Sequence, residues 1–261
     1  MNNETVGSLK ISGSGSAGGG IYDQVKISGS GKITGNVECN EFHISGSGKV
    51  EGNIKAKEFK TSGSSRITGS MEAAEIKISG SSRITGPVQC TEIKVSGSAN
   101  IEKDLKGDEI SISGSAEIGG SLNGENVRIS GGIDIEDDCE SEEFIARGSF
   151  KIGGLLNAGS IDIGVGGFCS AKEIGGEKIV VRELGVSGIW NRIVSMFTSH
   201  SVGLTTEIIE GDDIYLEYTT AKIVRGNNVT IGIGCIIDTV EYKNKLDIID
   251  GARVENQIKV D

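Results

Sequence analysis

The sequence predicts an all-β protein, a triangular β-helix with about 17 residues in each coil. Two observations lead to this fold. First, a Ser-Gly step recurs with a period of 17 from Ser28-Gly29 to Ser130-Gly131, and Glu recurs in the same period at positions 41, 58, 75, 92, 109, 143 and 177. Second, apolar side chains alternate with polar ones inside each repeat, as they do along a half-buried strand. So short and strict a period is typical of a solenoid.

Nine units fit without a gap over residues 25–177, with Val25 at coil position 1 and Glu41 at position 17. The apolar and small residues fall at positions 1, 3, 7, 9, 13 and 15, which make three inward-facing pairs. Gly occupies position 5 and usually position 11, where a corner needs close approach or unusual backbone angles. Position 9 is apolar throughout: Ile33, Val50, Ile67, Ile84, Ile101, Ile118, Ile135, Ile152 and Cys169.

Other repeat architectures fit less well. Helical solenoids use longer repeats with a 3.6-residue period, and Gly at this frequency would weaken helices. Collagen needs Gly at every third residue and abundant Pro, whereas this chain has one Pro.

Less regular segments flank the array. Residues 1–24 are expected to form an N-terminal segment and an irregular first coil, with a distorted corner at Gly18–Gly20. Residues 178–203 lose the phase and are expected to be an irregular insert. The alternation resumes over residues 204–261, where we expect about three further coils.

The insert contains the only Trp of the chain. Trp190, Ile193, Val194 and Phe197 are spaced as one face of a short helix. This apolar face either packs on the flank of the coils or binds a protein or membrane partner, and the sequence leaves both interpretations open.

Composition narrows the class of partner. A net charge of −11 disfavours nucleic acid and anionic lipid. The start of the chain has no signal-peptide pattern, and no apolar run is long enough to cross a membrane. We therefore expect a cytoplasmic protein, with membrane proximity left open. Four of the five cysteines fall at inward positions of the array, and none has metal-binding spacing, so we expect buried thiols and neither a metal nor another cofactor.

Two charged rows are expected on the surface. The Glu row at position 17 lies beside a basic row at position 2, which contains Lys26, His43, Lys60, Lys77, Lys94 and Arg128. Positions two apart share a strand face, so the rows offset each other's repulsion. They form either a self-neutralising surface or a lateral binding face.

The repeated Ile-Ser-Gly-Ser and Ile-Thr-Gly-Asn-Val motifs, followed by the ending that starts at Gly211-Asp-Asp-Ile-Tyr-Leu-Glu, resemble the bactofilins. These are polymer-forming cytoskeletal proteins of bacteria. The resemblance runs from about Leu9 to Val260. It implies a right-handed β-helix that polymerises end to end, without nucleotide, into non-polar filaments. Such filaments serve as scaffolds in cell shape, polar organisation or motility. The chain departs from the family in its longer coil array and in lacking Pro-rich tails and an evident membrane-targeting segment.

Polymerisation also follows from the coils themselves. A terminal coil exposes an unpaired strand edge and an open apolar core unless it is capped. The sequence shows no clear cap, so the candidate polymer-end contacts are Leu9, Ile11, Val254, Ile258 and Val260. We expect a structural, self-assembling scaffold with protein clients. The alternative is a monomeric β-helical binding module that docks through the Trp190–Phe197 segment.

An enzyme is disfavoured. Hexapeptide acyltransferases have a period of 18 and generally use a catalytic His, whereas His43 lies in the basic row and His200 in the insert. Polysaccharide lyases cluster their catalytic charges, and no such break interrupts the rows before Glu173. An ice-binding helix needs a flat Thr row, but Thr34, Thr68 and Thr85 are interrupted at position 10.

Overall fold

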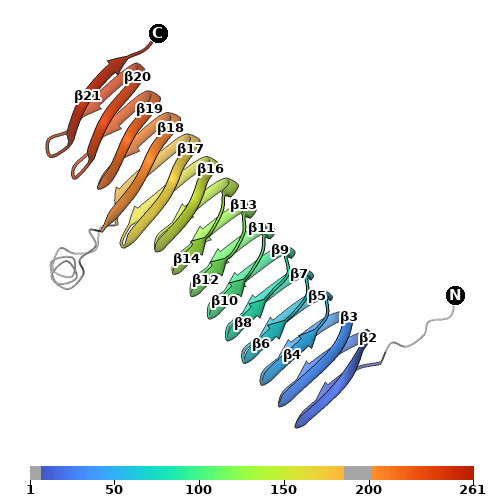
Figure 1. The fold of residues 1–261 in the computed structure, drawn as a ribbon. Helices are drawn as coiled ribbons and strands as arrows, with labels where there is room; N and C mark the ends of the chain where they lie inside the picture. Colours follow the sequence, from blue (N-terminus) through green and yellow to red (C-terminus); the bar gives the residue numbers. More distant parts are fainter. Residues whose placement is uncertain (1–6, 185–201) are drawn as a thin grey trace. The chain divides into compact units, whose positions relative to one another are not determined.

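The structure, a computed structural model, describes residues 7–184 and 202–261. Its regular secondary structure is entirely β: twenty-one strands and no helix lie in these residues. The chain divides into two compact units, unit 1 at residues 1–124 and unit 2 at residues 125–261. Figure 1 follows the strands from blue in unit 1 to red in unit 2. The all-β solenoid predicted from the sequence is confirmed.

Unit 1 contains strands β1 to β12, and β13 (Leu122–Ile129) contains the boundary with unit 2. Their bounds are β1 Leu9–Ile11, β2 Ser14–Ile27, β3 Ser30–Ile44, β4 Ser47–Glu51, β5 Ile54–Thr61, β6 Ser64–Ile67, β7 Met71–Ile78, β8 Ser81–Ile84, β9 Val88–Val95, β10 Ser98–Ile101, β11 Leu105–Ile112 and β12 Ser115–Ile118.

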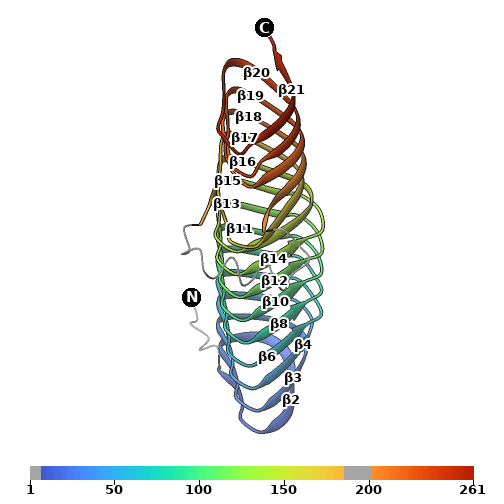
Figure 2. The same cartoon turned by 90° about the vertical axis from the view of Figure 1, so that its left-hand side faces the viewer.

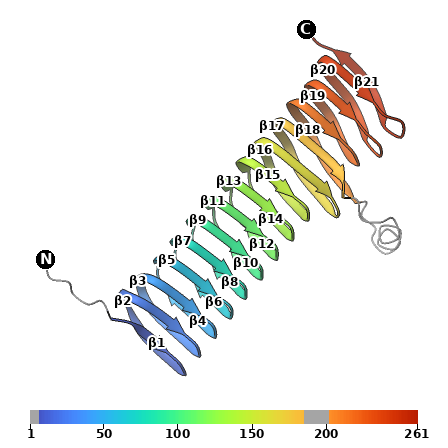
Figure 3. The ribbon, with the colours of Figure 1, turned by 180° about the vertical axis from the view of Figure 1, so that it is seen from behind.

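The strands of unit 1 pair in parallel and form two series, one of short strands and one of longer strands. The short strands β4, β6, β8, β10 and β12 follow one another (Figure 2), and the longer β3, β5, β7, β9 and β11 do the same (Figure 3). From β3 onward each residue pairs with the one 17 further along, as in Phe42 with Phe59 and Ile76 with Ile93. The period predicted from the sequence is therefore the length of one coil.

The core of unit 1 consists of rows of identical or similar side chains. Position 9 is fully buried, with Ile33, Val50, Ile67 and Ile84 at 0 % exposure. Residues at positions 1, 3, 13 and 15 are also buried, which confirms the three inward-facing pairs of each coil. Burying one aliphatic side chain stabilises a fold by about 1.5–3 kcal/mol, so the repetition of these rows supplies the stability of the unit.

The Ser-Gly corner needs Gly because successive coils approach closely there. A Cβ atom placed on Gly63 would lie 1.9 Å from the carbonyl oxygen of Gly46, and one placed on Gly80 would lie 2.0 Å from that of Gly63. No side chain fits at these distances. The Gly at position 5 therefore serves close stacking of backbone on backbone.

Unit 2 contains strands with a less regular register. Beyond β13 they are β14 Gly132–Ile135, β15 Cys139–Ala146, β16 Ser149–Val165, β17 Phe168–Glu183, β18 Gly203–Leu216, β19 Thr219–Ile231, β20 Ile236–Ile248 and β21 Arg253–Lys259. The paired residue numbers differ by 15 between β18 and β19, and by 17 between β20 and β21. β18, β19 and β20 each form most of a coil, and β21 begins another.

The ninth repeat differs from its predicted phase. Cys169 pairs with Phe150 and not with Ile152, so it occupies coil position 7, and Ala171 takes position 9 beside Ile152. Ser160 pairs with Lys178, which removes Glu177 from the predicted Glu row. The reason is that the offset between paired residue numbers rises from 17 to 19 and then falls to 18, across a bulge between Ile152 and Leu155.

The regular strand structure continues further than the sequence predicts. Residues 178–183 were expected to be irregular, but β17 continues through them to Glu183, with Ile179 and Val181 fully buried. β17 then pairs directly with β18, and the paired residue numbers differ by 35, as in Ile179 with Ile214.

Candidate self-association surfaces

The last coil of unit 2 leaves part of its apolar interior uncovered. β21 pairs only with residues 236–242 of β20. Residues 245–248 of β20 pair with β19 on one side, and no described strand pairs with the other side. Leu246 and Ile248 lie opposite the buried Val229 and Ile231, so both belong to inward rows. Ile248 is nevertheless 39 % exposed and Leu246 half-buried, because no described strand covers them.

Further apolar side chains of this coil are exposed at its corners and outer side. Ile233, Ile236 and Ile249 are 48 %, 50 % and 45 % exposed. Isoleucine side chains this exposed leave apolar surface in contact with water, which a second protein surface could cover. Sequence reasoning missed these residues. It also missed Leu246 and Ile248, for which the available signal is the match of Lys245–Ile248 to Asn228–Ile231, the preceding rung of the same rows.

β21 closes its own side of the coil with polar groups. Gln257 lies opposite the buried Val240, in a row that is apolar in the coil beneath it. Of the predicted end contacts in this strand, Val254 lies half-buried opposite Ile237, whereas Ile258 lies opposite Glu241 and is 46 % exposed. Gln257, unlike an apolar side chain in the same row, can be hydrated without a coil above it.

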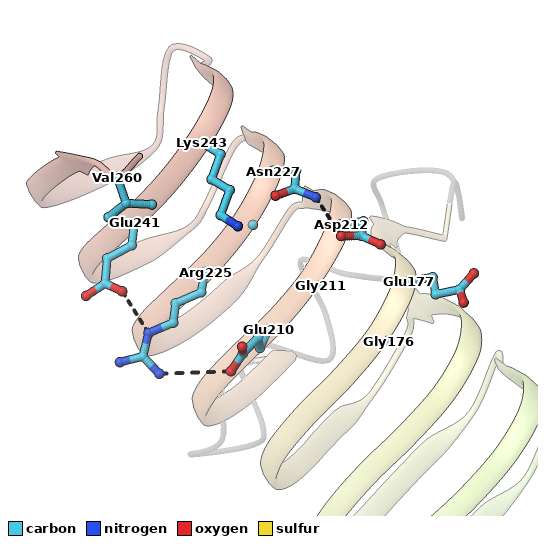
Figure 4. A pocket seen from close by; sticks show the side chains of 11 residues that line it. Gly176, Glu177, Glu210, Gly211, Asp212, Arg225, Asn227, Glu241, Lys243 and Val260 are labelled. Atoms are coloured by element: carbon cyan, nitrogen blue, oxygen red, sulfur yellow. Dashed lines mark hydrogen bonds and ion pairs between the residues drawn. The ribbon is translucent and has the colours of Figure 1, made fainter.

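The structure places Val260 on the flank of unit 2. It lines a groove of about 370 Å³ together with Arg225, Glu241 and Lys243 (Figure 4). The Arg225 Nε donates to Glu241 Oε2 at 2.7 Å, and an Arg225 Nη1 atom lies 4.0 Å from Glu210 Oε2. The bond to Glu241 raises the pKa of Arg225. Arg225 is thus paired with acids of the same groove.

The first coil of unit 1 contains the other two predicted end contacts, Leu9 and Ile11. Leu9 is half-buried, and Ile11 is only 8 % exposed because it packs beneath the following coil. The hydroxyl of Tyr22 donates to the Gly18 carbonyl oxygen at 3.0 Å, and its ring packs over Gly20. β2 has a bulge between Gly18 and Gly20, as expected for a distorted corner.

The two predicted charged rows of unit 1 lie side by side. Glu58, Glu75 and Glu92 stack in register, as do Lys60, Lys77 and Lys94. Each Lys forms an ion pair with the Glu two positions before it in its own coil. The ion pair lowers the pKa of Glu75 and raises that of Lys77. These rows are therefore neutralised within the molecule, and His43 is a member of the basic row.

A second basic row was missed by sequence reasoning. Lys32, Lys49, Arg66 and Arg83 occupy position 8 of successive coils and lie in register on β3, β4, β6 and β8. Their recurrence with the period of the coil was visible in the sequence. Lys32 and Lys49 share one carboxylate, Glu51, at 3.0 and 2.7 Å, and together they lower its pKa.

All five cysteines are buried free thiols, as the sequence predicts. Burial raises the pKa of Cys39, Cys169 and Cys235 to about 11, and that of Cys90 and Cys139 to about 12. Neutral thiols of this kind are weak nucleophiles and act as small apolar side chains. Among the residues that the structure describes, no cluster of three or more His, Cys, Asp or Glu side chains could hold a metal ion.

The candidate partner patch, Trp190, Ile193, Val194 and Phe197, lies outside the described residues. Within residues 7–184 and 202–261, no helix is long and apolar enough to cross a membrane.

The stacked coils, their buried rows of similar side chains and the uncovered last coil define the class of protein: a parallel β-solenoid with an exposed, unpaired strand edge. Residues 4–106 match the model of the bactofilin family, described as polymer-forming cytoskeletal. This match confirms, for residues 4–106, the resemblance to bactofilins seen in the sequence.

Two relatives from Bacillus subtilis (strain 168) are similar to parts of the chain. The uncharacterized protein YhbF is 37 % identical over 89 residues, which are 34 % of this chain and 34 % of YhbF. The uncharacterized protein YhbE is 51 % identical over 57 residues, 22 % of this chain and 24 % of YhbE. The chain thus matches about a third and about a quarter of the lengths of these relatives. No solved structure matches the chain significantly.

Proposed function

We propose that the protein is a structural cytoskeletal element that assembles end to end, without nucleotide, into filaments. These filaments act as a scaffold in the cytoplasm, for cell shape, polar organisation or motility, and recruit protein clients. The polymer-forming description of the matched family supports self-association. The protein is proposed to work by assembly and not by catalysis.

The observation that carries this proposal is the uncovered rung at residues 245–248. Its inward side chains, Leu246 and Ile248, continue the core rows of β19, and its backbone edge has no partner among the described strands. A terminal coil of a second copy could cover both. Such a contact would pair backbone groups and remove apolar surface from water, as each coil does for the next.

The test compares Ile248→Lys with Asn244→Lys. Both substitutions place a lysine in the last coil, at sites that are exposed to solvent. A lysine at position 248 would be buried in the contact, so we expect the critical concentration for assembly to rise at least about tenfold, equivalent to about 1.4 kcal/mol. Sedimentation and negative-stain electron microscopy, with and without nucleotide, measure this.

Asn244→Lys should assemble like the unchanged protein, and circular dichroism should show that both variants are folded. Unchanged assembly of Ile248→Lys would remove this rung from the contact. If the unchanged protein stays monomeric at every concentration, the alternative of a monomeric binding module is favoured. Imaging a fluorescent fusion in cells checks the cytoplasmic location and any proximity to the membrane.

A further inference from the structure

The charge of the chain is distributed unevenly between its two units. Residues 1–124 contain thirteen Lys and Arg against fourteen Asp and Glu, so they are close to neutral. Residues 125–261 contain thirteen Lys and Arg against twenty-three Asp and Glu. Nearly all of the net charge of −11 therefore belongs to unit 2.

Unit 1 carries an exposed basic row that its own acids do not neutralise. The four cations of position 8 stand on successive coils, about 4.8 Å apart. Lys32 and Lys49 have one acid between them, Glu51, and Arg83 lies 3.9 Å from Glu102. Arg66 makes no ion pair with any described residue. The row borders a shallow groove of about 720 Å³, whose other side is lined by serines 30, 47, 64 and 81.

Unit 2 carries an exposed acidic band with the same number of charges. Four carboxylates lie within a single coil, at the end of β14 and along β15: Glu136, Asp137, Glu140 and Glu142. All four are exposed, and none has an ion-pair partner in the part of the chain that the structure describes. Their neighbours Asp134 and Glu143 do have partners, Lys151 and Arg128.

We propose that the basic row of one copy binds the acidic band of a second copy, so that molecules associate side by side. Like charges held about 5 Å apart repel one another, and a complementary surface relieves this repulsion on both sides. Contact between two unit 2 surfaces is opposed by their common negative charge, and contact between two basic rows by their common positive charge. The contact that is not opposed by like charges is the one between the basic row of unit 1 in one molecule and the acidic band of unit 2 in another.

The strength of this contact should depend on salt. A single exposed ion pair contributes little, and only the number of pairs acting together makes the contact specific. Charges more than about 8 Å apart are screened at physiological ionic strength. This lateral contact rests on the proposed function, because it would join filaments side by side. It uses none of the residues assigned to the last coil.

The test is a charge swap carried out in the Ile248→Lys background, so that it does not depend on end-to-end assembly. One variant reverses the row with Arg66→Glu and Arg83→Glu. The other reverses the band with Glu136→Lys and Asp137→Lys. Lys103→Glu with Lys106→Glu is the control, since it makes the same charge change at exposed sites of unit 1 outside the row. Analytical ultracentrifugation at low salt and at about 0.5 M salt measures association.

The background protein and the control should associate at low salt and dissociate at high salt. Each reversed variant alone should associate at least about tenfold more weakly, because half of the opposite-charge contacts are then replaced by contacts between like charges. An equimolar mixture of the two should recover association, because the reversed row of one variant then meets the reversed band of the other. Failure of the background protein to associate, or of the mixture to recover, would overturn the proposal. Binding of anionic lipid vesicles that is lost only in the row variant would instead assign the row to a membrane.

Discussion

Cys139 shows how the position of one residue in a coil determines its chemistry. It occupies an inward position and is fully buried, so its ionised form loses hydration and its pKa rises to about 12. The other four thiols respond in the same way. Ile248 shows the opposite case, because it occupies an inward row but remains exposed where no described strand covers it. Whether an inward side chain of this protein is buried therefore depends on whether a further strand covers it, as well as on the type of side chain.

The raised thiol pKa values predict alkaline sensitivity. An unfolded thiol has a pKa of about 8.5, whereas the folded values are about 11 to 12. The folded state therefore binds more protons between these values, so the thiol contribution to stability is complete below about pH 8.5. It is lost as the pH rises through about 11 to 12. Denaturant unfolding at increasing pH measures this fall.

Thiol labelling provides the control for that prediction. At about pH 8 the folded protein should react slowly with a thiol reagent, and all five thiols should react after unfolding. Rapid labelling of the folded protein would show that the thiols are neither buried nor neutral.

At the scale of elements, close backbone stacking at the Ser-Gly corner limits what each strand connection can accept. Gly80→Ala should destabilise unit 1 by about 3 kcal/mol or more, because its Cβ would lie 2.0 Å from the Gly63 carbonyl oxygen. The matched control is Gly13→Ala, at the corresponding corner of the first coil, where nothing lies within 4 Å. Chemical unfolding of both variants measures the difference. Equal stability of the two variants would contradict the stacking explanation.

The elements also show what the sequence can predict. In unit 1 every inward row was predicted, because each residue stacks on its equivalent in the next coil and the pattern is the same in every coil. The ninth coil was misassigned because a shift by two positions leaves strand alternation unchanged, so Cys169 and Ala171 both fit an inward row. The insert was predicted to begin at residue 178, before β17 ends, for the same reason. Once the phase of the repeat is lost, it no longer identifies Ile179 and Val181 as inward residues.

The candidate surfaces were harder to predict than the core. A charged residue at an outward position is compatible with any partner or with none, so the row Lys32, Lys49, Arg66 and Arg83 gave no structural signal beyond its period. The uncovered Ile248 could not be distinguished from a buried Ile until the extent of β21 was known. The period thus predicts the core, whereas the surfaces depend on where each stack of strands ends.

For the molecule as a whole, the two proposed contacts use different physics and different residues. The last coil offers apolar surface and an unpaired strand edge, which favour strong contact along the stacking direction. The basic row and acidic band offer only exposed charges, which favour a weaker contact that depends on salt. Filament formation and side-by-side association should therefore separate experimentally, the first persisting at high salt and the second being lost.

The most direct measurement is negative-stain electron microscopy of the purified protein without nucleotide, over a range of concentrations and at high salt. The account predicts filaments that appear above a critical concentration and persist without nucleotide. Isolated particles of single-molecule mass at every concentration would contradict self-assembly through the last coil and would favour a protein that acts as a monomer.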